Sequence, residues 1–209
     1  VTPYVLINVL QAVAMFAVGA LVLPLLGSPP LAIQGVGALL LLTLAAQAHG
    51  AGDGDALEAL GLAERATPAG SVWTREYSDP TLMPGGALPD LGGFFTRPAE
   101  GASRGEDLLF LDTETTGLAG GTGTIPFLVG VSWWSDGLLR TRQYFLPGPG
   151  REAALLSDLE SLARGFAAVV TFNGASFDLP LLRTRARLER RRDPLADLAS
   201  WDLLVPCRR

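Results

Sequence analysis

Two carboxylic acids at alternating positions follow a short apolar run. Asp112 and Glu114 come directly after Leu108–Leu111, and such a run predicts a buried strand. Side chains two residues apart on a strand point to the same face, so Asp112 and Glu114 can converge on one spot. Neighbouring carboxylates repel each other unless a cation lies between them, and Mg²⁺ suits such oxygen ligands. A strand end with two solvated acids is the alternative interpretation of this short pattern.

A third acid follows a second strand-like run. Residues 168–173 are mostly β-branched, aromatic or small, and Gly174 permits a turn directly after them. A helix is expected from Phe177, with Pro180 at an early helical position. Asp178 therefore lies in a first helical turn, close to the end of a strand. The helix dipole alone favours an acid there, so Asp178 does not establish a site by itself.

Together these segments resemble the DEDD superfamily of 3′–5′ exonucleases, which have the ribonuclease-H-like fold. The closer similarity is to the bacterial YprB-like branch of that superfamily and covers about residues 108–209. It is carried by five motifs in the same order, namely Asp112–Leu118 (DTETTGL), Gly120–Thr124 (GGTGT), Phe127–Gly130 (FLVG), Phe172–Leu182 (FNGASFDLPLL) and Asp202–Arg209 (DLLVPCRR). The resemblance implies an α/β fold, a ribonuclease-H-like mixed sheet flanked by helices.

The resemblance also implies a function and a set of site residues. The expected enzyme is a 3′–5′ exonuclease that hydrolyses phosphodiester bonds at DNA or RNA ends through two Mg²⁺ or Mn²⁺ ions. Asp112, Glu114 and Asp178 would be both its catalytic residues and its metal ligands. The residues expected to orient these ligands or to bind the nucleic acid are Thr113, Thr115, Thr116, Gly117, Leu118, Asn173, Phe177, Arg183 and Arg187.

The basic residues near the third acid have two interpretations. Arg183, Arg187 and Arg190 would share one face of the expected helix and could hold a phosphate backbone. A solvated helix end that complements the helix dipole is the alternative.

One part of the DEDD pattern is absent from this sequence. A fourth carboxylate is expected on a later helix, shortly after a His or Tyr, but neither residue type follows Asp178. Asp193, Asp197 and Asp202 remain, and none has such a predecessor. We therefore expect a domain truncated before its third motif, with weak activity or none. The alternative function is a non-catalytic nucleic-acid-binding module that keeps the ribonuclease-H-like fold.

Residues 1–52 contain no charged side chain. Residues 3–26 are long enough to span a bilayer as a helix, residues 31–48 are borderline, and a turn is expected at Gly27–Pro30. A two-helix membrane hairpin, a gene-boundary artefact and buried soluble helices all fit residues 1–50. A membrane-anchored protein whose function lies in this N-terminal half is therefore a third interpretation.

Charge and cysteine content set wider limits. The net charge is −5, and this acidity does not suit strong non-specific binding to nucleic acid. The one cysteine, Cys207, excludes an internal disulfide and fits a reducing compartment. We expect a bacterial cytoplasmic protein, with or without membrane attachment through residues 3–48.

The elements that must position the acids follow from the residue pattern. Residues 51–106 are predicted to form a linker with a short helix near residues 56–64 and a strand near residues 71–77. The domain at residues 107–209 should have four strands, at residues 108–112, 127–134, 138–145 and 169–172, and two helices, at residues 151–164 and 177–192. Three antiparallel strands, a helix and a strand beside the first is the ribonuclease-H-like order.

Overall fold

The computed structural model describes residues 54–59, 61–79, 104–116, 123–148 and 150–207. The expected N-terminal helices at residues 1–50 and the site residues Gly117 and Leu118 lie outside these ranges. Within them, no helix is long and apolar enough to cross a membrane. The chain divides into two compact units, residues 1–62 and 63–209, and the described helix of the first is α3 (Gly54–Ala59).

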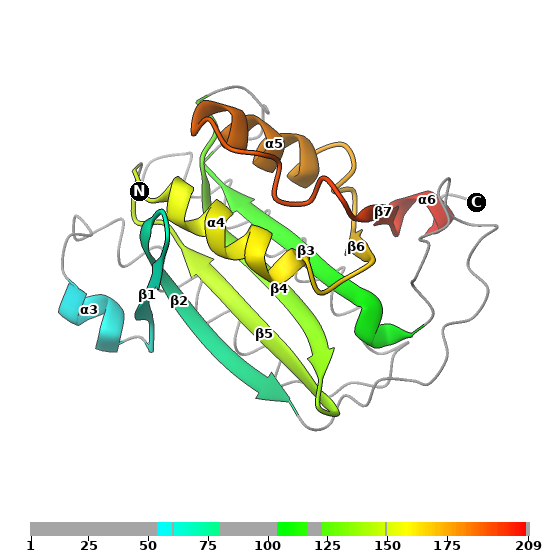
Figure 1. Cartoon of the computed structure of the whole chain (residues 1–209), viewed down its shortest axis with the longest axis horizontal. Coiled ribbons are helices and arrows are strands. Elements are labelled where there is room, and N and C mark those ends of the chain that lie inside the picture. Colours follow the sequence, from blue (N-terminus) through cyan, green and yellow to red (C-terminus); the bar gives the residue numbers. More distant parts are fainter. Residues whose placement is uncertain (1–53, 60, 80–103, 117–122, 149, 208–209) are drawn as a thin grey trace. The chain divides into compact units, whose positions relative to one another are not determined.

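A seven-stranded mixed sheet forms the second unit (Figure 1). Its strands lie in the order β1 (Ala63–Thr67), β2 (Gly70–Asp79), β5 (Leu138–Phe145), β4 (Pro126–Ser135), β3 (Leu108–Thr115), β6 (Ala168–Thr171) and β7 (Ala199–Asp202). Each pair of neighbours among β1, β2, β5, β4 and β3 is antiparallel, whereas β6 pairs parallel with both β3 and β7. The predicted mixed sheet flanked by helices, with three antiparallel strands and a later strand beside the first, is confirmed.

Two helices, α4 (Glu152–Ala163) and α5 (Asp178–Leu188), pack on one face of this sheet (Figure 1). The pleat of β3 explains the packing, because Leu109 and Leu111 join a buried cluster with Leu155 and Leu182 of the two helices. The alternate residues of β3 point to the opposite face of the sheet. On that face Leu108 packs in a smaller cluster with residues of β6 and β7. Two short helices complete the described unit, η2 (Gly105–Asp107) and α6 (Leu204–Cys207).

The helix predicted at residues 177–192 ends earlier, at Leu188. Arg190 has a φ of 54°, in the left-handed region, and the Arg191 N–H donates to the Ala186 carbonyl at 2.8 Å. Such a turn closes a helix by satisfying its last carbonyls. Arg190 therefore does not lie on a helix face with Arg183 and Arg187, and that part of the prediction is wrong.

The expected linker also differs from the structure. Residues 63–79 form the β1–β2 hairpin, and β2 pairs with β5 along seven residues from Trp73 to Asp79. The helix expected near residues 56–64 ends at Ala59, and Ala63 and Glu64 belong to β1 instead. The compact unit that contains the expected domain thus begins at Ala63.

Candidate active site

The acids of the first motif lie on one face of the central strand. Asp112 pairs with Gly130 and Glu114 with Leu128 of β4, in an unbroken register that shifts only after Glu114. Because the ladder is regular from Asp112 to Glu114, both side chains leave the same face, as predicted. A Cβ built on Gly130 would have only the Asp112 carbonyl oxygen, 4.0 Å away, within contact distance among the described atoms. As far as the described residues go, the position opposite Asp112 therefore leaves room for a group beside β4.

The third acid reaches this strand from the start of α5. Strand β6 pairs with β3 only as far as Phe110, so β3 extends past it toward the beginning of α5. Asp178 is buried there, and its Oδ1 accepts a short hydrogen bond from the Thr113 hydroxyl of β3. Thr113 points to the opposite face from Asp112 and Glu114, so Asp178 contacts β3 from the side on which α5 packs.

The charges of the three acids act on one another. Burial, together with the negative charges of Asp178 and Glu114, raises the pKa of Asp112 to about 8. Burial and the charge of Asp178 raise the pKa of Glu114 to about 7. The pKa of Asp178 is raised by burial, although hydrogen bonds from Thr113 and from backbone N–H groups oppose that shift. The three predicted acids are thus electrostatically coupled at one end of β3.

The chemistry of this donor set fits a hard divalent cation. All three donors are carboxylates, and a cation between them would relieve both the repulsion and the loss of solvent. Within the described ranges, however, no three His, Cys, Asp or Glu side chains are placed so that they could together hold a metal ion. The metal-ligand role of Asp112, Glu114 and Asp178 therefore stays a prediction.

The other predicted site residues lie at varying distances from the acids. Thr113 makes the contact to Asp178 that an orienting residue needs. Thr116 is exposed, and its hydroxyl accepts the Ile125 N–H at 3.1 Å, which closes the β3–β4 loop. Thr115 ends β3, and Phe177 is the residue that precedes α5. The substrate-binding roles of these residues stay predictions.

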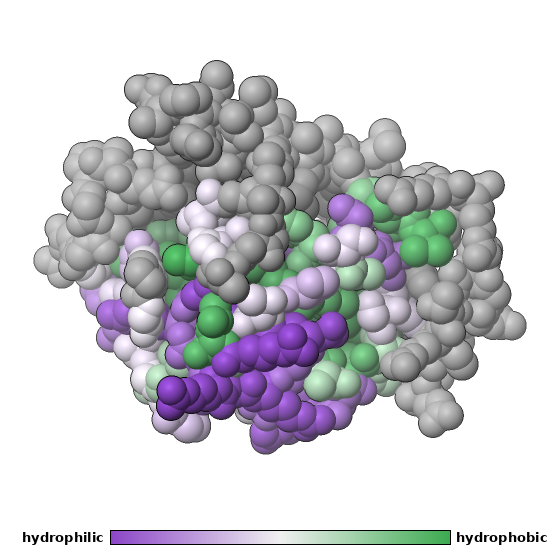
Figure 2. All heavy atoms as spheres, turned by 90° about the horizontal axis from the view of Figure 1, so that it is seen from above, coloured by the Kyte–Doolittle hydropathy of each residue, from purple (hydrophilic) through white to green (hydrophobic). Residues whose placement is uncertain are grey.

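Arg183 and Arg187, the two predicted phosphate-binding arginines of α5, lie further along the helix than Asp178 does. Arg183 forms an ion pair with Asp193, with an Nε–Oδ2 distance of 3.0 Å, whereas Arg187 is exposed near the end of the helix. At 1.5 Å of rise per residue, Arg187 lies about 14 Å along the axis from Asp178. Figure 2 shows that strongly hydrophilic side chains gather on the face seen from above, the side of the molecule on which α5 lies in Figure 1.

One acid beside the site was not assigned a role from the sequence. Asp202 is buried at the end of β7 and lies in register with Thr171 at the end of β6. Its carboxylate accepts the backbone N–H groups of Asn173 and Ala175, and its charge contributes to the raised pKa of Asp178. The residue pattern predicts no strand at residues 199–202, so it could not place Asp202 at the sheet edge where the carboxyl ends of β6 and β7 meet.

Comparison with known proteins places this fold and site in a class. Residues 109–209 match the family model of the RNase H superfamily. This part of the chain is therefore similar to that superfamily, in agreement with the motifs. It includes β3 to β7 and all three acids.

A bacterial protein and two solved structures resemble the chain. The uncharacterized protein YprB of Bacillus subtilis (strain 168) is 40% identical over 115 residues, which are 54% of this chain and 27% of YprB. The chain therefore spans about a quarter of that relative's length. Two structures of E. coli exonuclease I, a metal-free complex with single-stranded DNA and a complex with a dT13 oligonucleotide, match at 22% identity and a TM-score of 0.39. Each match covers 48% of this chain, and 29% and 28% respectively of the exonuclease chain.

Proposed function

We propose that this chain carries a metal-dependent nuclease site that removes nucleotides from the 3′ ends of DNA or RNA. The observation that carries the proposal is the coupling of three partly or fully buried acids, Asp112, Glu114 and Asp178, at one end of β3. Burying three acids together is unfavourable unless a ligand compensates for it. The match of residues 109–209 to the family model of the RNase H superfamily supports the same class of chemistry.

Each residue of the candidate site has a distinct role in this proposal. Asp112 and Glu114 hold a divalent cation on their shared strand face, and Asp178 approaches it from α5. Thr113 fixes the Asp178 carboxylate through its hydroxyl, which limits the rotation of that side chain. The open position at Gly130 leaves space beside Asp112 for the reacting phosphodiester. When bound, Mg²⁺ or Mn²⁺ would activate water and stabilise the charge that develops on the phosphate and the leaving oxygen.

A non-catalytic nucleic-acid-binding module is the second candidate function. The observation that favours it is that, among the residues that the structure describes, no three acids are placed so that they could together hold a metal ion. A binding module would bind an oligonucleotide and leave it intact.

A hydrolysis assay separates the two functions. Single-stranded oligonucleotides labelled at the 5′ or the 3′ end are incubated with the chain and Mn²⁺, and products are resolved by length. We expect stepwise shortening from the 3′ end by the unchanged chain. In Asp112→Asn the rate of hydrolysis should fall roughly a hundredfold or more, because a metal-ion contribution of several kcal/mol is lost. Asp136→Asn, in the exposed β4–β5 turn, is the matched control and should hydrolyse like the unchanged chain.

Two results would contradict the proposal. Equal hydrolysis by the unchanged chain and Asp112→Asn would place the activity elsewhere. Binding of the oligonucleotide without any Asp112-dependent hydrolysis would favour the binding module.

A further inference from the structure

Asp202 makes three hydrogen bonds with backbone N–H groups around the candidate site. Its Oδ1 accepts the N–H of Asn173 at 2.7 Å and that of Leu204 at 3.0 Å, and its Oδ2 accepts the N–H of Ala175 at 3.1 Å. The side chain is buried, with 7% of the residue exposed. A carboxylate that accepts this many N–H groups binds them more strongly than a neutral acceptor would.

The turn that Asp202 holds has an uncommon backbone. Asn173 has a φ of 64°, in the left-handed region that residues other than glycine rarely adopt. A Cβ at Gly174 would lie 2.4 Å from the Thr171 Cβ, so only glycine fits there. Such a turn persists where its surroundings stabilise it, and the two N–H bonds to Asp202 do so from the neighbouring strand.

The same turn carries Asp178 into the site. The Gly174 carbonyl accepts the N–H groups of Phe177 at 3.2 Å and Leu179 at 2.9 Å, and these two residues flank Asp178. A shift of the turn would therefore move the first turn of α5. Because Asp178 contacts β3 at Thr113, such a movement would separate the acid from β3.

The hydrogen bonds of Asp202 also bear on whether it could bind a metal ion together with the three acids. Both of its oxygens point to backbone N–H groups, one of them to two such groups. A metal ion would have to displace these donors, which hold the turn that positions Asp178. The geometry thus gives Asp202 a role through Asp178 rather than direct contact with an ion.

We propose that Asp202 is a positioning residue, which holds the β6–α5 turn in the form that brings Asp178 to Thr113, at the end of β3 that carries Asp112 and Glu114. The proposal rests on the proposed function, because it presupposes that these three acids act together on a divalent cation. The effect of Asp202 on the β6–α5 turn, however, can be measured without metal.

The test compares Asp202→Asn and Asp202→Ala with the unchanged chain. Asn keeps one oxygen acceptor and Ala keeps none, so a positioning role predicts graded effects. Asp107→Asn is the matched control, because Asp107 also accepts a backbone N–H, that of Arg104 at 2.8 Å. Asp107 precedes β3, about 17 Å from Asp112 along the strand. Amide hydrogen exchange at Leu179 is measured without metal, and calorimetric titration with Mn²⁺ then gives the affinity and the number of ions bound.

We expect Asp202→Asn to exchange the Leu179 amide faster and to bind Mn²⁺ roughly tenfold to a hundredfold more weakly, with the number of ions unchanged. Asp202→Ala should show larger effects, and Asp107→Asn should show none. Unchanged exchange at Leu179 in Asp202→Asn would overturn the positioning role, as would the loss of one bound ion, which would make Asp202 a ligand. If the unchanged chain binds no Mn²⁺, the proposed function fails, and the Leu179 exchange alone decides the role of Asp202 in the turn.

Discussion

At the scale of single residues, the three acids bring function and stability into opposition. The folded chain raises the pKa of Asp112 to about 8 and that of Glu114 to about 7, through burial first and mutual repulsion second. In the unfolded chain such groups lose their protons near pH 4. Between pH 4 and pH 8 the folded state therefore holds more protons than the unfolded state, and its stability falls as pH rises.

Removing one of these charges should stabilise the metal-free chain. We expect Asp112→Asn to gain stability over the unchanged chain, by roughly 1–3 kcal/mol more at pH 8 than at pH 5, because the amide cannot ionise. Urea unfolding at the two pH values measures the difference. Asp136→Asn is the control, since hydrogen bonds from Ser135 and Arg140 lower the pKa of that exposed acid, and its effect on stability should be the same at pH 5 and pH 8. A stability gain in Asp112→Asn that does not grow with pH would contradict the assigned shift.

How far the sequence predicts the site also depends on single residues. Asp112 and Glu114 were predictable because strand periodicity alone places i and i+2 on one face. The burial of Asp178 and its contact with Thr113 were not, because they depend on how far β6 runs beside β3. The contact of Asp202 with the Asn173 turn could not be predicted either, because it requires the register of two parallel strands.

At the scale of elements, a buried ionic cluster joins the β1–β2 hairpin to the rest of the sheet. Arg142 of β5 donates to Asp158 of α4 at 2.6 Å, Tyr144 donates to the same oxygen at 2.8 Å, and Arg65 of β1 donates to the other oxygen at 2.8 Å. Burial alone would raise the pKa of Asp158, but the hydrogen bonds from Arg65 and Tyr144 and the charge of Arg142 together lower it. The cluster thus ties residues outside the matched family region to the helix that covers the sheet.

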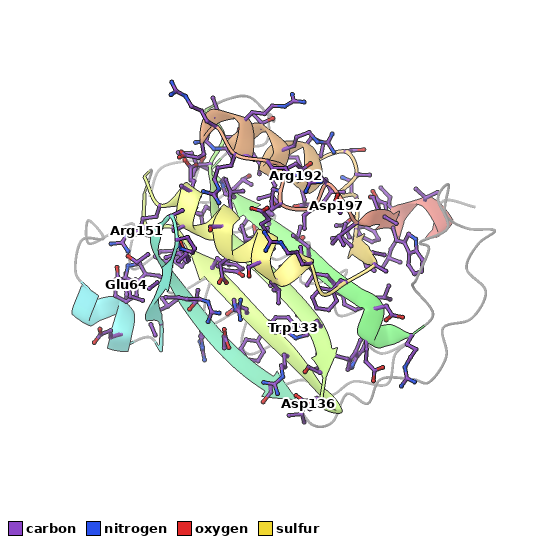
Figure 3. All side chains as sticks on the ribbon, in the orientation of Figure 1. Glu64, Trp133, Asp136, Arg151, Arg192 and Asp197 are labelled. Atoms are coloured by element: carbon purple, nitrogen blue, oxygen red, sulfur yellow. The ribbon has the colours of Figure 1, made fainter. Side chains whose placement is uncertain are left out.

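Removing an acid of this buried cluster should cost more unfolding free energy than removing an acid of an exposed ion pair. Asp158→Ala leaves the buried Arg142 with only the more exposed Glu76 as an acidic partner, and it should cost about 3 kcal/mol of unfolding free energy. Asp197→Ala removes an exposed pair with Arg192 at 2.5 Å (Figure 3) and should cost less than about 1 kcal/mol. Urea unfolding of both variants tests this, and equal costs would show that the Arg142–Asp158 contact does not stabilise the hairpin.

The same elements show which parts of the fold the sequence predicts. The strands at the centre of the sheet have long apolar runs and a clear turn at Asp136–Gly137, and they form close to where they were expected. Strand β1 (AERAT) was missed because it is short, largely exposed and composed of residues that favour helices. The end of α5 differs from the prediction for a related reason. The arginines at residues 190–192 have good helix propensity, and no residue pattern in the sequence marks the left-handed turn at Arg190.

At the scale of the whole molecule, charge is unevenly distributed along the chain. The net charge of −5 belongs to residues 1–106, whereas acids and bases balance in residues 107–209. Several of the arginines near α5 are paired with acids, including Arg185 with Glu152 at 2.6 Å in the interior between α4 and α5. Binding of a polyanion would therefore depend on local charge and on bound cations more than on a strongly basic surface.

The measurement that tests the central claim most directly is a calorimetric titration of the whole chain with Mn²⁺ at neutral pH, repeated in buffers of different ionisation enthalpy. We predict that the unchanged chain binds Mn²⁺ and releases protons, because ligation requires Asp112 and Glu114 to lose protons held with pKa values of about 8 and 7. Asp112→Asn should bind far more weakly, and the control Asp136→Asn should bind like the unchanged chain. Absence of binding to the unchanged chain, or equal binding and proton release by Asp112→Asn, would contradict the claim that these acids form a metal site.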